Sequence, residues 1–360
     1  MILQSFLISI LTSSLFTPMI IKLAKKSGIV DIPNYRKVHK VPTPLLGGLA
    51  IYFSFLVGVW FVKPSHPAHV SILIGSMIII IIGILDDRYE LSPKVKFFGQ
   101  ILAAAVVIFY GNLFVHFINL PFNGSLQLGW LTVPITFLWI VGVTNAINLI
   151  DGLDGLSAGV TGIAMIAMAG MAYFMGDLYV LPMAVILIGA IIGFLPYNFY
   201  PAKIFMGDTG ALFLGFMISI LSLLGFKNIT FITFIVPLLI LGVPISDTVF
   251  AIIRRLVNRK PISRADKSHL HHRLLELGFS HRQAVLLIYC LSAMFAMFAF
   301  VFSMTTIWGS FFLLCIIILA LELLIEKLGL INKNYKPILR VLEYWRMQRS
   351  RKGIQPREKS

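Results

Sequence analysis

The chain has 360 residues, of which 58% are hydrophobic and only 12% are charged. Soluble globular proteins carry about 25% charged residues, so this composition excludes a cytosolic enzyme, a secreted domain and a disordered protein. Thirty lysine and arginine residues against 15 aspartate and glutamate residues give a formal charge of +15. In a membrane protein such an excess indicates cytoplasmic loops that face anionic lipid, and we expect no nucleic-acid partner.

Eleven apolar runs approach the roughly 20 residues that a helix needs to cross a bilayer. In chain order they cover residues 2–21, 45–62, 70–85, 97–115, 130–147, 156–175, 178–196, 210–226, 229–253, 283–304 and 308–328. The ninth run contains Pro237, Gly242 and Pro244, and we expect it to be broken because proline removes a backbone donor. The predicted fold class is therefore all-α, a polytopic integral membrane protein with 10–11 transmembrane helices. These helices form a single domain over residues 1–330. A basic cytoplasmic tail follows at 331–360, and we interpret it as disordered.

The positive charges predict the orientation of these helices. All but two of the 30 lysine and arginine residues fall in the C-terminal tail or in loops on one side of the membrane, and the exceptions are Lys63 and Lys227. Loops rich in lysine and arginine stay in the cytoplasm. The N-terminus is therefore predicted outside and the C-terminus inside, which agrees with an odd number of spans.

Most of the aspartates are predicted at the cytoplasmic ends of the spans, whereas Asp177 alone is predicted on the outside. A carboxylate costs roughly 2.5–3.5 kcal/mol at mid-membrane and less near the interface, so each needs a partner or a water-filled cleft. The attraction of helix ends for polar residues explains one or two of them, but not a whole set on one face. We predict that they share one acidic site: Asp86, Asp87, Asp151, Asp154, Asp208 and Asp247.

A stripe of polar residues at the end of the fifth run is the most specific part of this set. Asn145, Asn148, Asp151 and Asp154 recur at every third residue, which on a helix places them on one face. Amide and carboxylate oxygens are the ligands that a hard divalent cation such as magnesium takes. The alternative is a polar seam between two helices.

The other acidic positions are ambiguous when taken singly. Asp86 and Asp87 end the third run, where an isolated pair is often only a solvated helix end, and Lys94 and Lys96 follow closely enough to neutralise it or to bind phosphate. Asp208 precedes a Thr-Gly pair at the start of the eighth run and, alone, would be an N-cap. Beside the other clusters, a metal or phosphate role is the better interpretation.

The longest cytoplasmic loop carries a histidine cluster among basic residues. His269, His271, His272 and Arg273 follow six lysines and arginines between residues 254 and 267. No cysteine and no H-E-x-x-H pattern supports zinc binding. We expect these side chains to donate to phosphate oxygens, with surface histidines in a basic loop as the alternative. An acidic metal site beside a basic loop suits phosphoryl transfer between a soluble diphosphate and a lipid phosphate, which needs charge neutralisation and alignment.

From about residue 20 to 285, the sequence resembles the polyprenyl-phosphate N-acetylhexosamine-1-phosphate transferases, the superfamily of the peptidoglycan translocase. Five motifs carry the resemblance in order: Pro42-Thr43-Pro44 to Gly47-Gly48, Asp86-Asp87, Asn145–Gly155, Phe205–Gly210 and Ser268–Arg273. The last motif is similar to that of the branch using UDP-N-acetylglucosamine (UDP-GlcNAc). The peptidoglycan branch, which uses UDP-MurNAc-pentapeptide, has a different histidine cluster.

The resemblance implies a reaction. GlcNAc-1-phosphate would pass from UDP-GlcNAc to undecaprenyl phosphate, giving undecaprenyl-diphospho-GlcNAc and UMP, with magnesium as cofactor and manganese as the alternative. The implied location is the bacterial plasma membrane, as a multi-pass protein with its active site facing the cytoplasm. The product would start teichoic acid, O-antigen or a related envelope glycan. We favour teichoic acid, from the overall texture of the sequence, and leave a homodimer open.

The resemblance also implies roles for individual residues. Asp208 and Asn148 are similar to the magnesium ligands, with Asp151 and Asp154 as catalytic neighbours. Asp86 or Asp87 is similar to a carboxylate that deprotonates or orients the lipid phosphate, although a phosphate already ionised at pH 7 gains little from a base. The implied substrate contacts are Lys94, Asn145, His269, His271, His272 and Arg273.

Three other functions remain as alternatives. The first is a phospho-MurNAc-pentapeptide translocase. The second is an intramembrane prenyltransferase, which needs diphosphate-binding aspartate motifs in two repeats, and the sequence carries no second copy. The third is a transporter, which needs carboxylates nearer to mid-membrane. Release of UMP from UDP-GlcNAc in the presence of undecaprenyl phosphate would separate the predicted transferase from the prenyltransferase and the transporter.

Overall fold

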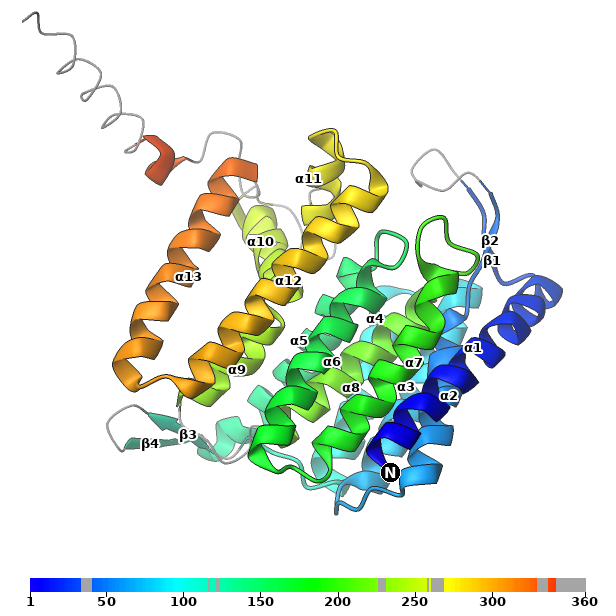
Figure 1. Cartoon of the computed structure of the whole chain (residues 1–360), viewed down its shortest axis with the longest axis horizontal. Helices are drawn as coiled ribbons and strands as arrows, with labels where there is room; N and C mark the ends of the chain where they lie inside the picture. Colours follow the sequence, from blue (N-terminus) through cyan, green and yellow to red (C-terminus); the bar gives the residue numbers. More distant parts are fainter. Residues whose placement is uncertain are drawn as a thin grey trace, which may run out of the picture.

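The computed structural model describes residues 1–33, 41–115, 117–120, 124–225, 231–257, 259, 269–328 and 336–340. Most of the described chain is helical (Figure 1). The helices are α1 (Ile2–Ser27), α2 (Gly47–Val62), α3 (His69–Tyr89), α4 (Pro93–Ala105), α5 (Thr132–Ile150), α6 (Leu156–Met175), α7 (Val180–Asn198), α8 (Gly207–Gly225), α9 (Phe231–Ile240), α10 (Gly242–Val257), α11 (Leu270–Glu276), α12 (His281–Met304) and α13 (Ile307–Leu328). The strands form two antiparallel hairpins, β1 (Val30–Asp31) with β2 (Thr43–Pro44) and β3 (Phe117–Leu120) with β4 (Gly124–Gln127).

The predicted all-α polytopic membrane fold is confirmed. Within the described ranges, nine helices are long and apolar enough to cross a bilayer: α1, α3, α4, α5, α6, α7, α8, α12 and α13. The fourth of the predicted spans continues from α4 into a π-helical turn at Val106–Tyr110. The two remaining predicted spans are α2, which has 16 residues, and the pair α9 and α10. The ninth span is broken as expected, since α9 ends at Ile240 and α10 begins at Gly242.

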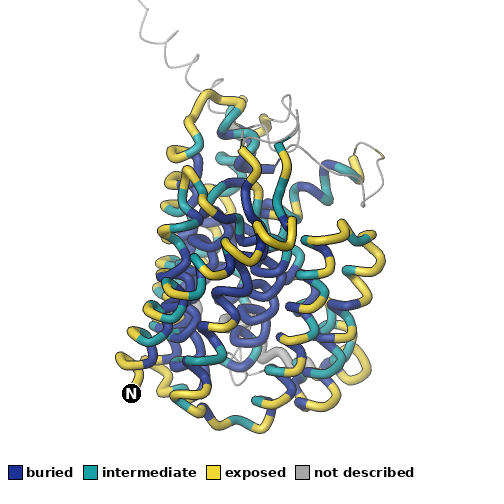
Figure 2. Tube along the Cα trace, turned by 90° about the vertical axis from the view of Figure 1, so that its right-hand side faces the viewer, coloured by how far each residue is buried: buried dark blue, intermediate teal, exposed yellow. Residues whose placement is uncertain are grey.

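Buried residues gather in the interior of the bundle and exposed ones along its outside (Figure 2). Helix α8 is the most buried of these spans and packs against α2, α3, α5 and α6. Lipid is as apolar as leucine, so membrane helices associate through close packing at small residues. Gly48 of α2 lies against the backbone of Gly210, and Gly83 of α3 lies against the backbone of Thr209. A Cβ atom at either glycine would collide with α8. These two contacts fix where α8 begins relative to α2 and α3.

The helices after α8 pack more loosely. Helix α12 contacts α6, α9 and α10, α11 packs against α12, and α13 packs against α12 at the edge of the molecule (Figure 1). Only 17% of the apolar window of α13 is buried, compared with 83% for α8. The molecule thus has a tight bundle centred on α8 and a second, more open group of helices from α9 to α13.

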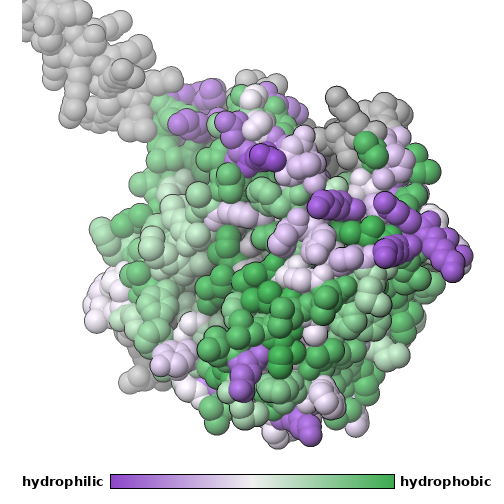
Figure 3. Space-filling model, turned by 45° about the vertical axis from the view of Figure 1, so that its right-hand side comes forward, coloured by the Kyte–Doolittle hydropathy of each residue, from purple (hydrophilic) through white to green (hydrophobic). Residues whose placement is uncertain are grey.

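One end of the bundle gathers the segments that contain the predicted site. Helices α3, α5, α7 and α10 end there, and α4, α6, α8 and α12 begin there, whereas the N-terminus and the β3–β4 hairpin lie at the opposite end (Figure 1). Hydrophilic side chains are concentrated toward the same end, while hydrophobic residues cover most of the flank (Figure 3). We call it the charged end.

Candidate active site

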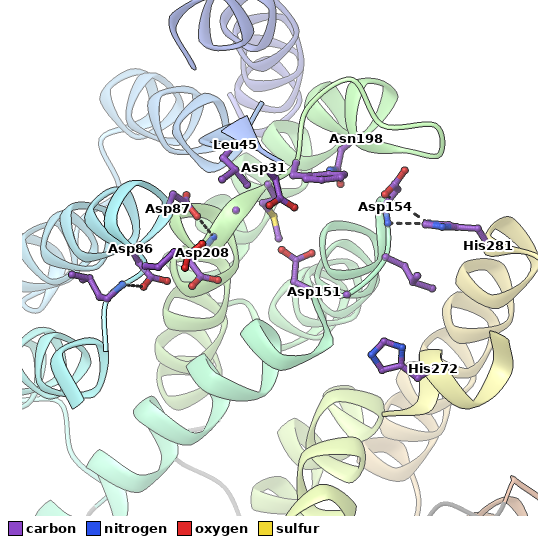
Figure 4. A pocket seen from close by; sticks show the side chains of 17 residues that line it. Asp31, Leu45, Asp86, Asp87, Asp151, Asp154, Asn198, Asp208, His272 and His281 are labelled. Carbon is purple, nitrogen blue, oxygen red and sulfur yellow. Dashed lines mark hydrogen bonds and ion pairs between the residues drawn. The ribbon is translucent and has the colours of Figure 1, made fainter. Parts of the chain in front are cut away.

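A cavity of about 530 Å³ opens at the charged end between α3, α5, α8 and the start of α12 (Figure 4). Most of its ionisable lining is acidic, and two histidines face it from the α11–α12 side. Its acidic and histidine lining residues are Asp31, Asp86, Asp87, Glu90, Asp151, Asp154, Asp208, His272 and His281. Residues as far apart in the sequence as Asp31 and His281 therefore meet around one cavity.

Lys96 neutralises two of these carboxylates. Its Nζ lies 2.7 Å from Oδ2 of Asp86 and also forms an ion pair with Asp208. The other oxygen of Asp86 accepts a hydrogen bond from the N–H of Leu91, at 2.8 Å. Asp86 is thus tied to the start of α4 and to Lys96, and Asp208 faces the cavity with a cation on one side.

The Asp87 carboxylate holds the start of α8. It accepts hydrogen bonds from the N–H groups of Asp208 (2.7 Å) and Thr209 (3.2 Å) and from the Thr209 hydroxyl (2.6 Å). A carboxylate that accepts free N–H groups at a helix N-terminus is favoured by capping and by the helix dipole. Gly207 has φ +71° and leaves no room for a side chain beside Asp87. Asp87 therefore fixes the backbone that carries Asp208.

Asp151 lies between α5 and α6 and points into the cavity toward Asp208 (Figure 4). In the part of the chain that the structure describes, its carboxylate has no hydrogen bond or ion pair. Burial, followed by the negative charges of Asp208, Asp87 and Asp154, raises the pKa of Asp151 well above its usual value of 3.8. Among the described residues, no cation pairs with Asp151 to stabilise its ionised form.

Asn148, one turn before Asp151, contributes a second unsatisfied oxygen. Its Oδ1 is buried and has no hydrogen-bond partner among the described residues. Buried polar atoms are almost always paired, so an orphaned oxygen beside the unpaired Asp151 carboxyl group indicates that a cation belongs here. The chemistry of the donors, two carboxylates and an amide oxygen with Asp208 included, suits magnesium.

The protein alone does not form a complete metal cage. Among the described residues, no three His, Cys, Asp or Glu side chains converge closely enough to hold an ion. Magnesium commonly binds through one or two carboxylates and completes its octahedral shell with water and substrate phosphates. The donor set fits this open kind of site better than a closed structural site.

Asp154 and the loop around it are held by α12. The N–H of Asp154 donates to Nε2 of His281 at 3.0 Å, and its Oδ2 accepts from the N–H of Ala202 at 3.0 Å. One residue later, the Tyr289 hydroxyl donates to the carbonyl of Gly155 at 2.5 Å. Asp154 is therefore placed in the cavity wall, and α12 fixes the loop that carries Asp151.

Two of the predicted substrate contacts lie away from the cavity. Asn145 donates from Nδ2 to Gln100 Oε1 (2.5 Å) and to the Val141 carbonyl (2.8 Å), so it joins α5 to α4. This is the polar seam that the sequence left open as an alternative for this stripe. Lys94 is exposed, and it is Lys96 that reaches Asp86 and Asp208.

The four predicted residues of the histidine loop have four different surroundings. His272 lines the cavity (Figure 4). His271 is buried against Gly152, and burial, with a smaller contribution from the neighbouring His272, lowers its pKa to about 3. His269 donates to Asp247, and Arg273 donates to Glu276 at 2.8 Å. Of the four, His272 alone lines the cavity. Ser268, the first residue of this motif, lies outside the described residues.

The cavity also contains residues that sequence reasoning missed. Asn198 ends α7 and donates from Nδ2 to the carbonyl of Ile204 at 3.0 Å, and Asp31 belongs to β1. Asn198 lies at the charged end like the aspartates, so extending the argument from carboxylates to amides would have found it. For His281, which starts α12, the sequence carries no such signal.

The comparison with known proteins identifies the family. The family model for glycosyl transferase family 4 matches residues 69–226, which hold three of the acidic motifs. The chain is 48% identical over 339 residues to a probable undecaprenyl-phosphate N-acetylglucosaminyl 1-phosphate transferase of Bacillus subtilis, covering 93% of this chain and 94% of the relative.

Two further relatives come from other bacterial groups. A decaprenyl-phosphate N-acetylglucosaminephosphotransferase of Mycobacterium tuberculosis is 33% identical and covers 74% of each chain. An undecaprenyl-phosphate alpha-N-acetylglucosaminyl 1-phosphate transferase of Escherichia coli is 28% identical and covers 81% of each chain. The chain therefore belongs to glycosyl transferase family 4, among the membrane-embedded polyprenyl-phosphate N-acetylhexosamine-1-phosphate transferases.

Proposed function

We propose that the chain transfers GlcNAc-1-phosphate from UDP-GlcNAc to undecaprenyl phosphate and releases UMP. The observation that carries this proposal is Asp151, which lines an acidic cavity with no paired cation among the described residues and lies one helical turn after the unpartnered Asn148 oxygen. His272 faces the same cavity from the other side. A diphosphate with a divalent cation supplies the missing positive charge and brings anionic oxygens within reach of His272. The names of the Bacillus and Escherichia relatives support GlcNAc-1-phosphate as the transferred group and undecaprenyl phosphate as the acceptor.

The reaction balances without a redox partner. A phosphate oxygen of undecaprenyl phosphate attacks the phosphorus that carries GlcNAc. The new P–O bond joins lipid and sugar phosphates, and the bond from that phosphorus to the bridging oxygen breaks with its electron pair leaving on UMP. Most of the barrier is electrostatic, because three anionic groups must align.

We assign the metal-holding role to Asp208, Asp151 and Asn148. Bound there, magnesium would neutralise diphosphate charge and polarise the phosphorus under attack. Lys96 already neutralises Asp86 and part of Asp208, which limits repulsion between the wall and the incoming phosphates. Asp154 shapes the wall through its contacts with His281 and Ala202.

The contacts of Asp86 and Asp87 favour orientation over proton abstraction. Both oxygens of Asp87 accept hydrogen bonds from the start of α8, and both oxygens of Asp86 are engaged by Leu91 and Lys96. A lipid phosphate is largely ionised at pH 7, so the attacking oxygen does not need a base. We therefore assign these two residues to holding Asp208 and Lys96 in place.

We further propose that the cavity faces the cytoplasm of a bacterial cell. All but two of the lysine and arginine residues fall in segments that the sequence predicts on one side of the membrane. Of the described ones, Arg88, Lys94, Lys96 and Arg282 lie near the ends of helices at the charged end, which supports this orientation. The test uses a background in which Cys290 and Cys315 are replaced by serine. S92C at the charged end should react with a membrane-impermeant thiol reagent only from the cytoplasmic side, and S65C at the opposite end only from outside. The reverse labelling would overturn the orientation.

The deciding experiment measures UMP release and lipid-linked sugar with purified protein and undecaprenyl phosphate. UDP-GlcNAc should support both products with magnesium or manganese, and EDTA should abolish them. Activity with UDP-MurNAc-pentapeptide alone, or no UMP release from any UDP-sugar, would contradict the proposal. We propose teichoic acid as the polymer served, so depletion in the host should lower wall teichoic acid before other envelope glycans.

A further inference from the structure

A buried aspartate outside the cavity holds the start of α11, the helix that carries His272. Asp247 lies on α10 and is only 4% exposed. Its Oδ2 lies 2.9 Å from Nδ1 of His269, and its Oδ1 accepts the N–H of Leu270 at 2.9 Å. One carboxylate thus engages both a side chain and the backbone at the point where α11 begins.

The chemistry of this contact determines what His269 can do. An ionised carboxylate only accepts hydrogen bonds, so Nδ1 of His269 carries the proton. In the neutral ring, Nε2 then has a lone pair and cannot donate to a phosphate oxygen. His269 is also 5% exposed and does not line the cavity. Its position therefore differs from that expected of a substrate contact.

The same contact supplies what the start of α11 lacks. His269 is the N-cap residue of α11, in an extended conformation, but its own side chain makes no capping hydrogen bond. Asp247 instead reaches across from α10 and takes the first N–H of the helix. The carbonyl of His269 then accepts the N–H of Arg273 at 3.0 Å, which starts the helical hydrogen-bond pattern.

The anchored helix carries the two histidines that reach the acidic side. The rings of His269 and His271 are nearly parallel, with centroids 5.9 Å apart, and His271 packs against Gly152 next to Asp151. His272 follows with its ring centroid 4.2 Å from that of His271 and lines the cavity. A displacement of His269 would therefore move His272 relative to Asp151.

We propose that Asp247 is a positioning residue and that His269 is its partner, not a ligand of the substrate. Together they fix the start of α11 on α10 and set the distance between His272 and the acidic wall. The anchoring is a property of the free protein, and its effect on turnover rests on the proposed GlcNAc-1-phosphate transfer.

The test compares two isosteres of His269. Asparagine places its amide nitrogen near the position of Nδ1, whereas glutamine places it near Nε2. If His269 acts through Nδ1 on Asp247, H269N should keep kcat within about threefold of the original value, and H269Q should lose roughly ten- to a hundred-fold, the range of a lost charge-assisted hydrogen bond. KM for undecaprenyl phosphate should stay unchanged in both. Higher activity of H269Q than of H269N would overturn the proposal, because it would place the functional nitrogen at Nε2.

Hydrogen–deuterium exchange of the ligand-free protein gives a readout that does not depend on the reaction. Asp247→Ala should speed amide exchange in α11 while α8 stays protected. Asp177→Ala is the matched control, since Asp177 similarly caps α7 through Tyr179 and Val180 at the opposite end. Unchanged exchange in α11 would overturn the anchoring. Faster exchange in a protein that never releases UMP would support the anchoring and refute only the proposed reaction. If Asp247→Ala does not fold, the H269N and H269Q pair decides.

Discussion

The acidic and basic sides of the cavity are built in different ways. On the acidic side, backbone lies directly on backbone where Gly48 and Gly83 meet the start of α8. On the basic side, polar contacts add to the packing of α11 and α12, such as those of Asp247 with His269 and of His281 with the Asp154 N–H. Close packing leaves the acidic residues little freedom, whereas each polar contact can be removed by one substitution. The two sides should therefore respond differently to mutation.

The largest expected effect on activity comes from Asp208. Asp208→Ala removes a carboxylate from the proposed metal site, and even partners that only support a metal ligand are worth 10–100-fold, so kcat/KM should fall by more than about 100-fold. Asn148→Ala should also lower kcat/KM, but by a smaller factor. Initial rates at limiting magnesium measure both, with Asp177→Ala as the control at the opposite end. Near-normal turnover of Asp208→Ala would refute the ligand assignment.

The close packing of the acidic side is tested at Gly83. Gly83→Val forces a side chain into the Thr209 backbone, and overpacking of this kind costs about 3 kcal/mol or more where the neighbour cannot move. The midpoint of thermal unfolding in detergent should fall clearly. Gly142→Val is the matched control, since nothing lies within 4 Å of the position of a Cβ there. Equal midpoints for the two variants would show that α3 and α8 can separate at little cost.

The basic side is tested by comparing two neighbours on α11. His272→Ala removes the cavity-lining donor, so kcat/KM for UDP-GlcNAc should fall by roughly ten- to a hundred-fold with a lower kcat, because the leaving UMP gains charge as the bond breaks. Arg273→Ala should lose less, since Arg273 is paired with Glu276 away from the cavity. Steady-state kinetics with both substrates separate the effects. A larger loss for Arg273→Ala would mean that this loop rearranges when the donor binds.

The smallest expected effect concerns the hydrogen bond from Tyr289 of α12 to the Gly155 carbonyl. Tyr289→Phe deletes the hydroxyl that donates to the Gly155 carbonyl and should cost about 0.5–1.5 kcal/mol of unfolding free energy, the net worth of one hydrogen bond. Tyr173→Phe, whose ring is exposed, is the control. If the two variants unfold at the same temperature, α12 does not hold the Asp151 loop through this contact.

The fold and the acidic residues were accessible from the sequence because the bilayer imposes strong rules. Apolar runs must be long enough to span, so their number and order follow from composition. A carboxylate at the end of a span needs a partner or a water-filled cleft. Five of the six aspartates predicted to share one site line one cavity in the structure: Asp86, Asp87, Asp151, Asp154 and Asp208. The prediction was wrong for Asp247, which pairs with His269 and Leu270 outside the cavity. The broken ninth span followed from Pro237 and Pro244.

The basic and amide positions were less accessible, because they depend on helix phase and on distant pairing. Lys94 and Lys96 both follow Asp86 and Asp87 closely enough in the sequence to pair with them. Lys96 lies four residues before the buried Gln100 and so shares its inward face of α4, whereas Lys94 does not. Asn145 shares the stripe of Asn148 but lies one turn deeper, where Gln100 satisfies it. No local pattern links these two helices in advance.

The pairing of Asp247 with His269 was inaccessible for another reason. The two residues are 22 positions apart in the sequence, one on α10 and the other at the start of α11. Because the loop is basic, its composition predicts that a histidine there donates a hydrogen bond to a phosphate oxygen. Only the fold shows that a carboxylate already accepts its proton-bearing nitrogen.

The broken ninth span has a consequence for biosynthesis. Helix α9 has 10 residues and is about 15 Å long, half of the roughly 30 Å hydrocarbon core, so it is a poor independent insertion signal. Its main packing partner, α12, starts at His281 and leaves the ribosome about 40 residues later. Before α12 is synthesised, α10 can already pack against α5, which precedes it in the chain. Chains that terminate before α12 should therefore leave α9 without its main packing partner in the membrane and become targets for quality-control proteolysis.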